Sequence, residues 1–373
     1  MKPETLAVHA GADIDHETAA VSPPIHLSTT FEHPADVGEL KGYLYGRYGN
    51  PTQDRLESAL AALEGGALAR VFASGMAAAN ALLQNLPAGG HVLMADDCYF
   101  SVRRLAQAWF PRWGLTLDLV DMTDAAAVRA AMRPNTCCLW VETPSNPLLK
   151  LSAVAPLAQI ARAAGALLVV DATFATPLLL TPLALGADVV MHSTTKYLGG
   201  HSDVSGGALV FAREDALAQA VGEIRTLQGA IASPFASWLV LRGLRTLAPR
   251  LDWHQRNAMA VAHFLAAHPR VSAVHYPGLA SHPQHALVGS EMRGPGGMLS
   301  FEVAGTRADA IAVAARLKLF VNATSLGGYE SLVEHRQSSE GAGSPTPETL
   351  LRLSVGLEHA DDLIADLDQA LAG

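Results

Sequence analysis

Residues 166–196 read ALLVVDATFATPLLLTPLALGADVVMHSTTK and contain two short apolar segments that each end in polar residues. One strand is predicted over 166–171, ending at Asp171, and a second over 189–192, shortly before Lys196. Strands that are apolar on both faces and are joined by helices are typical of a parallel sheet covered on both sides. In such sheets ligands bind at the carboxyl ends of the strands. We therefore expect Asp171 and Lys196 to lie at the sheet edge that carries the site.

The alternation of strands with helices continues on both sides of this stretch. Further strands are predicted over 91–95, 116–120, 137–142 and 208–211, and helices over 53–63 and 152–164. From about residue 235 longer helices and then strand-like segments follow, at 236–246, 251–268 and 298–303. These patterns predict an α/β fold with a mostly parallel central sheet flanked by helices, and a smaller C-terminal α+β domain. We expect an extended N-terminal arm (1–50), a cofactor-binding domain (51–240) and a C-terminal domain (241–373).

The composition narrows the possible partners of the chain. With 373 residues, of which 50% are hydrophobic and 16% charged, the chain is expected to be globular with a sizeable core. A net charge of −9 provides no basic face, which argues against nucleic acids and membrane surfaces as partners. The N-terminal stretch lacks the apolar run of a secretory signal, and three cysteines suit neither a disulfide framework nor a metal site. We therefore expect a cytoplasmic protein without a metal.

Lysine is scarce in this sequence, which shortens the search for a nucleophilic amine. The five lysines are Lys2, Lys41, Lys150, Lys196 and Lys318. Only Lys196 follows a strand that is predicted to be buried, and burial lowers a lysine pKa and raises the fraction of neutral amine. The alternative is a surface lysine that caps the end of a strand. Taken alone, Lys196 does not decide between the two.

Asp171 favours the reactive interpretation of Lys196. A carboxylate at the end of an apolar strand is costly unless it is paired, and the pyridinium nitrogen of pyridoxal 5′-phosphate (PLP) is a suitable partner. An aspartate and a lysine on neighbouring strand ends are the minimal set for PLP chemistry, with Lys196 holding the cofactor as a Schiff base. The alternative is that Asp171 caps the following turn.

Other residues supply the remaining contacts that PLP needs. Residues 72–78, FASGMAA, form a small-residue turn into an Ala-rich helix, whose free N–H groups and dipole favour a phosphate. The hydroxyl groups of Ser193 and Thr195 are further candidate phosphate donors. Tyr99 lies at a strand end and could stack on the pyridine ring, and its alternative is an ordinary core tyrosine.

Two arginines are candidates for anion binding. Arg47 lies in YGRYGNPT (45–52) of the arm, which is long enough to reach a neighbouring subunit. Arg352 alternates with apolar residues in LRLSVG (351–356), so a strand there leaves a guanidinium that needs a carboxylate, such as that of an amino-acid substrate. For both, a structural salt bridge is the alternative.

Residues 338–347, rich in Gly, Ser and Pro, are expected to form a flexible loop, and whether it gates the site stays open.

Taken together, these motifs resemble the Cys/Met-metabolism family of PLP enzymes, which includes cystathionine γ-synthase and the cystathionine γ- and β-lyases. The resemblance extends from TLAVHAG (5–11) to DDL (361–363), almost the whole chain. Its most specific parts are YGR (45–47), SGM (74–76), ETPSNP (142–147) and STTKYLGGHSD (193–203). The resemblance implies an aspartate-aminotransferase-like (type I) fold, a PLP-binding domain at 51–240 and a homotetramer, a dimer of dimers with shared active sites.

The resemblance also assigns roles to individual residues. The cofactor would be bound by Gly75, Met76, Tyr99, Asp171, Thr173, Ser193, Thr195 and Lys196 of one subunit and by Tyr45 and Arg47 of its neighbour. Asn146, Ser325 and Arg352 would bind the substrate. Lys196, Tyr99, Tyr45 and Ser325 would take part in catalysis.

The implied reaction is cleavage of a carbon–sulfur bond in L-cystathionine or a related sulfur amino acid, by α,β- or α,γ-elimination. Many relatives carry acids where this chain has Leu44 and Thr324, so the physiological substrate stays open. YGR (45–47) and GGYESL (327–332) are similar to bacterial β-lyases, whereas SL (325–326) and GGMLSF (296–301) are similar to the γ enzymes. Cystathionine γ-synthase, acting on an O-acylhomoserine and cysteine, is therefore the alternative.

Two other classes of protein are alternatives to a PLP enzyme. An NAD(P)-dependent oxidoreductase on a doubly wound sheet would need a Gly-x-Gly-x-x-Gly turn after an early strand, and this sequence has none. A binding protein without PLP would leave Lys196, Asp171 and Arg352 without a shared purpose. The sequence therefore favours a PLP enzyme over both.

Overall fold

The computed structural model describes residues 1–36, 42–341 and 344–373. Within these residues the larger sheet has seven strands in the order β1-β7-β6-β5-β4-β2-β3. They are β1 (Leu68–Phe72), β2 (His91–Ala95), β3 (Thr116–Val120), β4 (Thr136–Glu142), β5 (Leu167–Asp171), β6 (Val189–His192) and β7 (Gly207–Phe211). Neighbouring strands from β6 to β3 are parallel, and β7 is antiparallel to both β6 and β1. The predicted mostly parallel sheet is confirmed.

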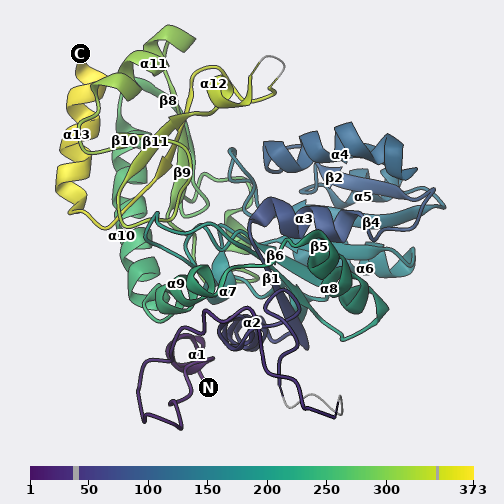
Figure 1. The fold of residues 1–373 in the computed structure, drawn as a ribbon. Coiled ribbons are helices and arrows are strands. Elements are labelled where there is room, and N and C mark those ends of the chain that lie inside the picture. Colours follow the sequence, from purple (N-terminus) through teal and green to yellow (C-terminus); the bar gives the residue numbers. More distant parts are fainter. Residues whose placement is uncertain (37–41, 342–343) are drawn as a thin grey trace.

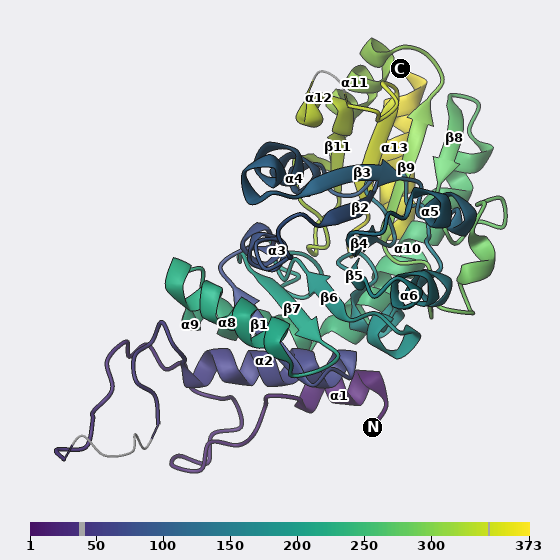
Figure 2. The ribbon, with the colours of Figure 1, turned by 90° about the vertical axis from the view of Figure 1, so that its right-hand side faces the viewer.

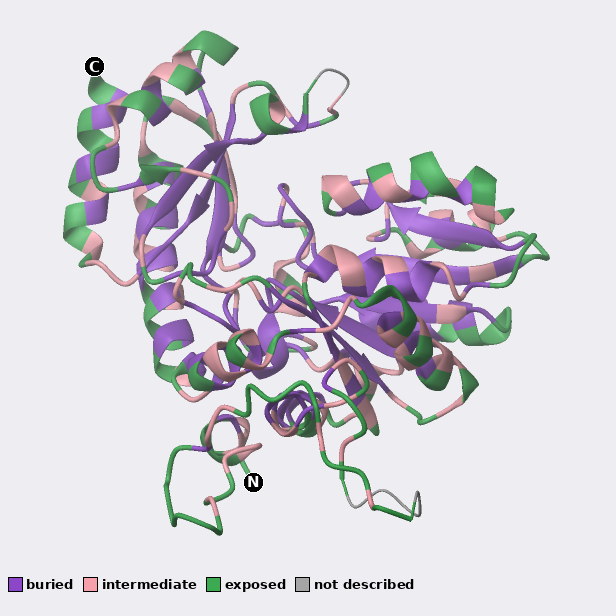
Figure 3. Ribbon diagram, in the orientation of Figure 1, coloured by how far each residue is buried: buried purple, intermediate pink, exposed green. Residues whose placement is uncertain are grey.

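Helices cover both faces of the larger sheet. Figure 2 shows α3, α4 and α8 on one side and α5 and α6 on the other. The helices are α2 (Pro51–Glu64), α3 (Gly75–Leu83), α4 (Phe100–Trp113), α5 (Ala125–Ala131), α6 (Val154–Ala163), α7 (Thr176–Leu179), α8 (Ala216–Gln228) and α9 (Pro234–Leu244). The inner strands are buried on both faces, as apolar runs such as LLVVD in β5 require (Figure 3).

The C-terminal part contains a second, smaller sheet in the order β10-β11-β12-β9-β8. Its strands are β8 (Val271–His275), β9 (Met298–Val303), β10 (Val321–Asn322), β11 (Leu332–His335) and β12 (Leu350–Ser354). On its outer side lie α10 (Leu247–Ala267), α11 (Arg307–Arg316) and α13 (Ala360–Ala372), as Figure 1 shows. Leu251 of α10 belongs to the core of the larger sheet and Ala258 to that of the smaller one, so this helix joins the two cores.

Several predicted elements need correction. Strand β1 was not predicted, because Arg70 interrupts a five-residue segment. Helices α9 and α10 begin earlier than predicted; for α9 the reason is that the Ser233 hydroxyl accepts the N–H of Ala236, with Pro234 in the first turn. The N-terminal arm is not wholly extended, since α1 (Pro3–His9) packs its buried Ala7 toward α2.

The predicted loop at 338–347 is partly helical. Helix α12 (Arg336–Glu340) includes its first residues, held by an ion pair within the helix, and residues 342–343 of the predicted loop lie outside the described residues. None of the described helices is both long enough and apolar enough to cross a membrane.

Candidate active site

A cavity of about 390 Å³ lies at the carboxyl ends of the parallel strands, where the two sheets meet. Its walls come from the ends of β4, β5 and β6 on one side and from β11, β12 and α12 on the other. The lining residues used below are Gly75, Met76, Tyr99, Glu142, Asn146, Asp171, Thr173, Ser193, Thr195, Lys196, Thr324, Ser325, Glu334, Arg336, Ser339, Glu340 and Arg352. The site thus lies where the strand-end rule predicted it.

Lys196 presents its amine to this cavity. It follows β6 through a turn in which its N–H bonds to the carbonyl of Ser193 at 3.2 Å. Its Nζ donates to Ser325 Oγ at 2.7 Å. Burial, together with the guanidinium of Arg352, lowers the pKa of Lys196 to about 8. A larger fraction of the amine is therefore neutral near physiological pH than in an exposed lysine.

Ser325 is held in an uncommon backbone conformation. Its φ of 86° lies in the left-handed region, which is costly for a residue with a side chain. Its carbonyl accepts Arg352 Nη2 at 3.1 Å, so the arginine helps to hold the turn. The turn places the Ser325 hydroxyl on the Lys196 amine.

Asp171 ends β5 and is buried with the carboxylate facing the cavity. Its Oδ1 accepts the N–H of Thr173 at 3.0 Å and the Thr173 hydroxyl at 2.5 Å. Thr173 Oγ1 in turn accepts the N–H of Ser193 at 2.9 Å, which joins the ends of β5 and β6. Both bonds to Asp171 use Oδ1 and leave Oδ2 for a cationic donor. Burial raises the pKa of Asp171 and outweighs the two bonds from Thr173, which lower it.

The start of α3 forms a small anion cradle. Ser74 caps this nine-residue helix by accepting the N–H of Ala77, which leaves the N–H groups of Gly75 and Met76 free. An added Cβ at Gly75 would lie 3.1 Å from Cβ of Ser193, so a side chain at this position would require Ser193 to shift. Thr195 also lines the cavity, and its hydroxyl donates to the carbonyl of Gly206 at 3.2 Å.

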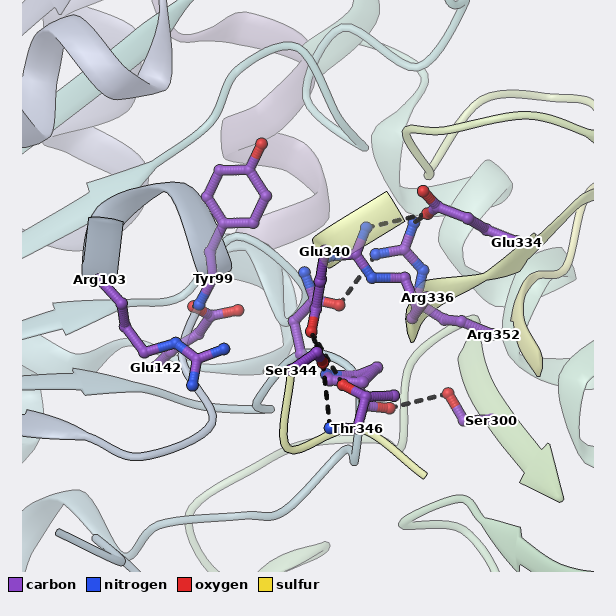
Figure 4. A network of polar contacts seen from close by, with 12 residues as sticks. Tyr99, Arg103, Glu142, Ser300, Glu334, Arg336, Glu340, Ser344, Thr346 and Arg352 are labelled. Carbon is purple, nitrogen blue, oxygen red and sulfur yellow. Dashed lines mark hydrogen bonds and ion pairs between the residues drawn. The ribbon is translucent and has the colours of Figure 1, made fainter. Parts of the chain in front are cut away.

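Tyr99 precedes α4, and its ring is partly exposed at the cavity (Figure 4). Its N–H donates to Glu142 Oε2 at 2.6 Å. Glu142 ends β4 beside Asp171 in the sheet register, and burial together with Asp171 raises its pKa well above the ordinary value. We did not predict a role for Glu142; a carboxylate at the end of an apolar strand was the available signal.

Arg352 projects from β12 and joins both walls of the cavity. Its Nη1 donates to Asn146 Oδ1 at 2.8 Å, and its Nη2 donates to the Ser325 carbonyl and to Glu334 Oε2. Glu334 therefore already supplies the carboxylate that we expected from a substrate, so the salt-bridge alternative is correct in part. These bonds use three of the five guanidinium N–H groups, which leaves two for a ligand.

The acidic partner of Arg352 belongs to a larger ion-pair network that the sequence did not reveal. Glu334 Oε2 also accepts Arg336 Nη1 at 3.1 Å, and Arg336 Nη2 donates to Glu340 Oε1 at 2.8 Å (Figure 4). Burial raises the pKa of Glu334, but Arg352 and Arg336 outweigh this effect and the net pKa is lowered. The network thus alternates positive and negative charges across one wall of the cavity.

The two predicted residues of the N-terminal arm lie away from this cavity. Arg47 Nη1 donates to the carbonyl of Thr226 at 3.0 Å, and its guanidinium lies over the Tyr48 ring. Tyr45 is exposed at 43%. Leu44 also lies on the exposed arm, whereas Thr324 lines the cavity. A single chain therefore does not bring Tyr45 and Arg47 to Lys196.

Among the residues that the structure describes, no group of three or more His, Cys, Asp or Glu side chains is placed to hold a metal ion.

Comparison with known proteins gives a consistent result. Residues 4–372 match the family model described as Cys/Met metabolism PLP-dependent enzyme. The chain is 47% identical over 375 residues to cystathionine gamma-synthase of Mycobacterium tuberculosis, covering 99% of this chain and 96% of the relative. It is 43% identical to cystathionine beta-lyase of Lactococcus lactis, covering 99% and 98%. The crystal structure of cystathionine gamma-lyase from Lactobacillus plantarum complexed with L-serine matches with a TM-score of 0.94 at 38% identity, covering 100% and 99%.

Proposed function

This chain belongs to the Cys/Met metabolism family of PLP-dependent enzymes, and from that membership we propose that it is a carbon–sulfur lyase of trans-sulfuration. It cleaves L-cystathionine or a related sulfur amino acid by α,β- or α,γ-elimination. The observation that carries the proposal is the Ser325-bound amine of Lys196, with its pKa lowered to about 8, in one cavity with Asp171 and Arg352. Because the chain belongs to a PLP family, the alternative of an NAD(P)-dependent oxidoreductase is rejected.

The residues of the cavity fit PLP. The buried carboxylate of Asp171, with Oδ2 unused, suits a pyridinium nitrogen, and the cradle at Gly75, Met76 and Ser193 suits a phosphate. Lys196 would hold the cofactor, with Tyr99 against its ring and Thr173 fixing Asp171. When bound, PLP supplies a ring that withdraws electrons and stabilises negative charge at the substrate Cα.

The chain's own groups would then move protons and orient the substrate. Two N–H groups of Arg352 stay available for the substrate carboxylate, and Asn146 is fixed beside them by its bond to Arg352. The neutral amine of Lys196 takes the Cα proton, and Ser325 orients that amine. For a leaving group on Cγ, the same amine also moves a Cβ proton.

The product formed from L-cystathionine tests this proposal. The purified holoenzyme would be incubated with L-cystathionine and the keto acid and thiol identified. Pyruvate with homocysteine means β-elimination, and 2-oxobutyrate with cysteine means γ-elimination. Activity that requires an O-acylhomoserine plus cysteine, with no cleavage of cystathionine, would reject the lyase in favour of cystathionine γ-synthase. The 47% identity to a γ-synthase supports that second candidate.

The lowered pKa of Lys196 predicts how cofactor uptake depends on pH. Because burial disfavours the ammonium form, the neutral amine increases as pH rises through about 8 rather than 10.5. At pH 7 about one amine in ten is then neutral, against about one in 3,000 for an ordinary lysine. We expect the rate at which cofactor-free protein takes up PLP, followed by stopped-flow absorbance, to be half-maximal near pH 8. A midpoint above pH 10 would contradict the assignment.

The arm supports a shared active site. Tyr45 and Arg47 lie outside their own chain's cavity, and Tyr48 beside them is also exposed, which suits contact with a neighbouring subunit. We propose that the chain assembles as a homotetramer, a dimer of dimers in which Tyr45 and Arg47 reach the neighbour's cofactor. Sedimentation velocity measures this directly: a species of 39.1 kDa at micromolar concentration would reject the assembly.

The cysteines support a location in the reducing cytoplasm. Cys98, Cys137 and Cys138 are free thiols, and burial raises the pKa of each, which lowers the fraction of reactive thiolate. Recovery of the protein outside the cytoplasmic fraction of cells would reject this location.

A further inference from the structure

Arg336 is a buried cation on the cavity wall that has donors to spare. It begins α12 and is 6% exposed. Its two bonds to Glu334 and Glu340 use two of five guanidinium N–H groups. Its Nε is buried and has no acceptor among the described residues. Arg336 thus keeps more free donor capacity than Arg352, of which three N–H groups are engaged.

Neighbouring bonds hold Arg336 in place. Glu340 Oε2 accepts the hydroxyls of Ser344 at 2.5 Å and Thr346 at 3.0 Å, so its other oxygen stays on Arg336. Glu334 lies on β11, opposite Arg352 of β12 in the sheet register. The guanidinium is therefore tethered on two sides and cannot turn away from the wall that it lines (Figure 4).

An unpaired acceptor lies next to this unpaired donor. Glu334 Oε1 is also buried and makes no hydrogen bond of standard geometry within the described part of the chain; the Ser339 hydroxyl beside this carboxylate helps to lower the pKa of Glu334. The same carboxylate binds Arg336 through Oε2, so the two unpaired atoms belong to bonded side chains. In a cavity wall, such atoms keep hydrogen-bonding capacity that a ligand can use. A ligand group that carries both a carboxylate and an ammonium would satisfy both atoms.

The distal end of a substrate is the part that meets this wall. Arg352 and Asn146, beside Ser325 and the Lys196 amine, are placed for the reacting amino-acid head. Arg336 is connected to Arg352 through Glu334, which accepts a bond from both arginines. Thr324 on this wall carries no charge for a distal head group, whereas Arg336 and Glu334 do.

We propose that Arg336 is a specificity-determining residue that binds the distal carboxylate of a thioether with an amino-acid head at each end, while Glu334 Oε1 accepts the distal ammonium. The inference rests on the proposed function, from which the thioether substrate is taken. It names the preferred substrate class as L-cystathionine rather than short S-alkyl amino acids.

A comparison of substrates tests the inference on the unmodified chain. S-propyl-L-cysteine and S-ethyl-L-homocysteine carry the two scissile bonds of L-cystathionine without its distal head group. We expect kcat/KM for L-cystathionine to exceed that of the matching truncated thioether by about 10- to 100-fold, mainly through KM. Equal values would overturn the inference while leaving the lyase in place.

Two variants assign the preference to Arg336. The double variant Arg336→Gln with Glu340→Gln removes one charge of each sign, and Arg336→Lys keeps the charge but loses the planar fork. Both are expected to lose most of the preference for L-cystathionine, because kcat/KM should fall more for L-cystathionine than for the truncated thioethers. The control is the double variant Arg256→Gln with Asp252→Asn, which removes an exposed ion pair with the same spacing. It should change neither the preference for L-cystathionine nor the cleavage of the truncated thioethers. A parallel loss on all three substrates would overturn the inference.

Calorimetry separates this inference from the proposed function. Binding of L-cystathionine and S-propyl-L-cysteine to PLP-loaded Lys196→Ala protein is measured with and without the Arg336→Lys change. Tighter binding of L-cystathionine that depends on Arg336 supports the inference. If the parent enzyme nevertheless cleaves none of the thioethers, only the proposed lyase function is rejected. Equal binding of both ligands overturns the inference.

Discussion

Replacing Lys196 with alanine is expected to lower kcat at least about 1,000-fold and to remove the visible absorbance of covalently bound PLP. Among the described lysines, Lys196 alone lines the cavity. Lys150 forms ion pairs with Asp96 and Asp121. Burial alone would lower its pKa, but the neighbouring acids outweigh this effect and the net pKa is raised. No other described amine can therefore replace the one that is lost.

The measurement is the absorbance spectrum of the purified variant together with its steady-state rate. Lys318→Ala is the control, because it removes a lysine from outside the cavity. An unchanged spectrum in Lys196→Ala would remove Lys196 from its proposed role. The spectrum also tests PLP binding independently of which substrate the enzyme prefers.

The change Asp171→Asn is expected to lower kcat by about 100- to 1,000-fold. Asparagine keeps an oxygen that accepts from Thr173, but it carries no charge to hold a pyridinium proton. Because burial raises the pKa of Asp171, the charged carboxylate is disfavoured in the folded, cofactor-free chain. The neutral asparagine should therefore leave the thermal midpoint of the cofactor-free protein unchanged or raise it.

This combination distinguishes a cofactor role from a structural one. Activity and the thermal midpoint of the cofactor-free protein are measured on the same preparation. Asp188→Asn is the control, since Asp188 is another acid of the same sheet that accepts from Leu168 and Arg213 outside the cavity. A fall in the midpoint that matches the loss of activity would show that Asp171 serves the fold and not the cofactor.

Local sequence patterns were sufficient for most of the larger sheet. The runs at 91–95, 116–120 and 189–192 coincide with β2, β3 and β6, because apolar runs of strand length bounded by polar residues carry their own signal. The antiparallel β1 lacked that signal, since Arg70 divides its apolar residues. Pairing with β7, distant in the chain, makes it a strand.

The candidate site was predictable where residues follow strand ends. Asp171, Ser193 and Lys196 each come directly after an apolar strand, and parallel strands bring such ends to one edge. The free donor capacity of Arg352 could also be anticipated from its place in a strand. Its acidic partner could not, because Glu334 is placed by the antiparallel register of β11 and β12.

By itself, the sequence determined the α/β fold, the scarcity of lysines and the strand-end residues, since these depend on periodicity along the chain. Tertiary structure decided which distant groups meet. Ser325 reaches Lys196 across 129 positions of sequence, and Glu334 divides its carboxylate between Arg352 and Arg336. Such contacts arise from packing one sheet against another, and residue order carries no local record of them. The network beside Lys196, and with it the donor on Arg336, was therefore visible only in the folded chain.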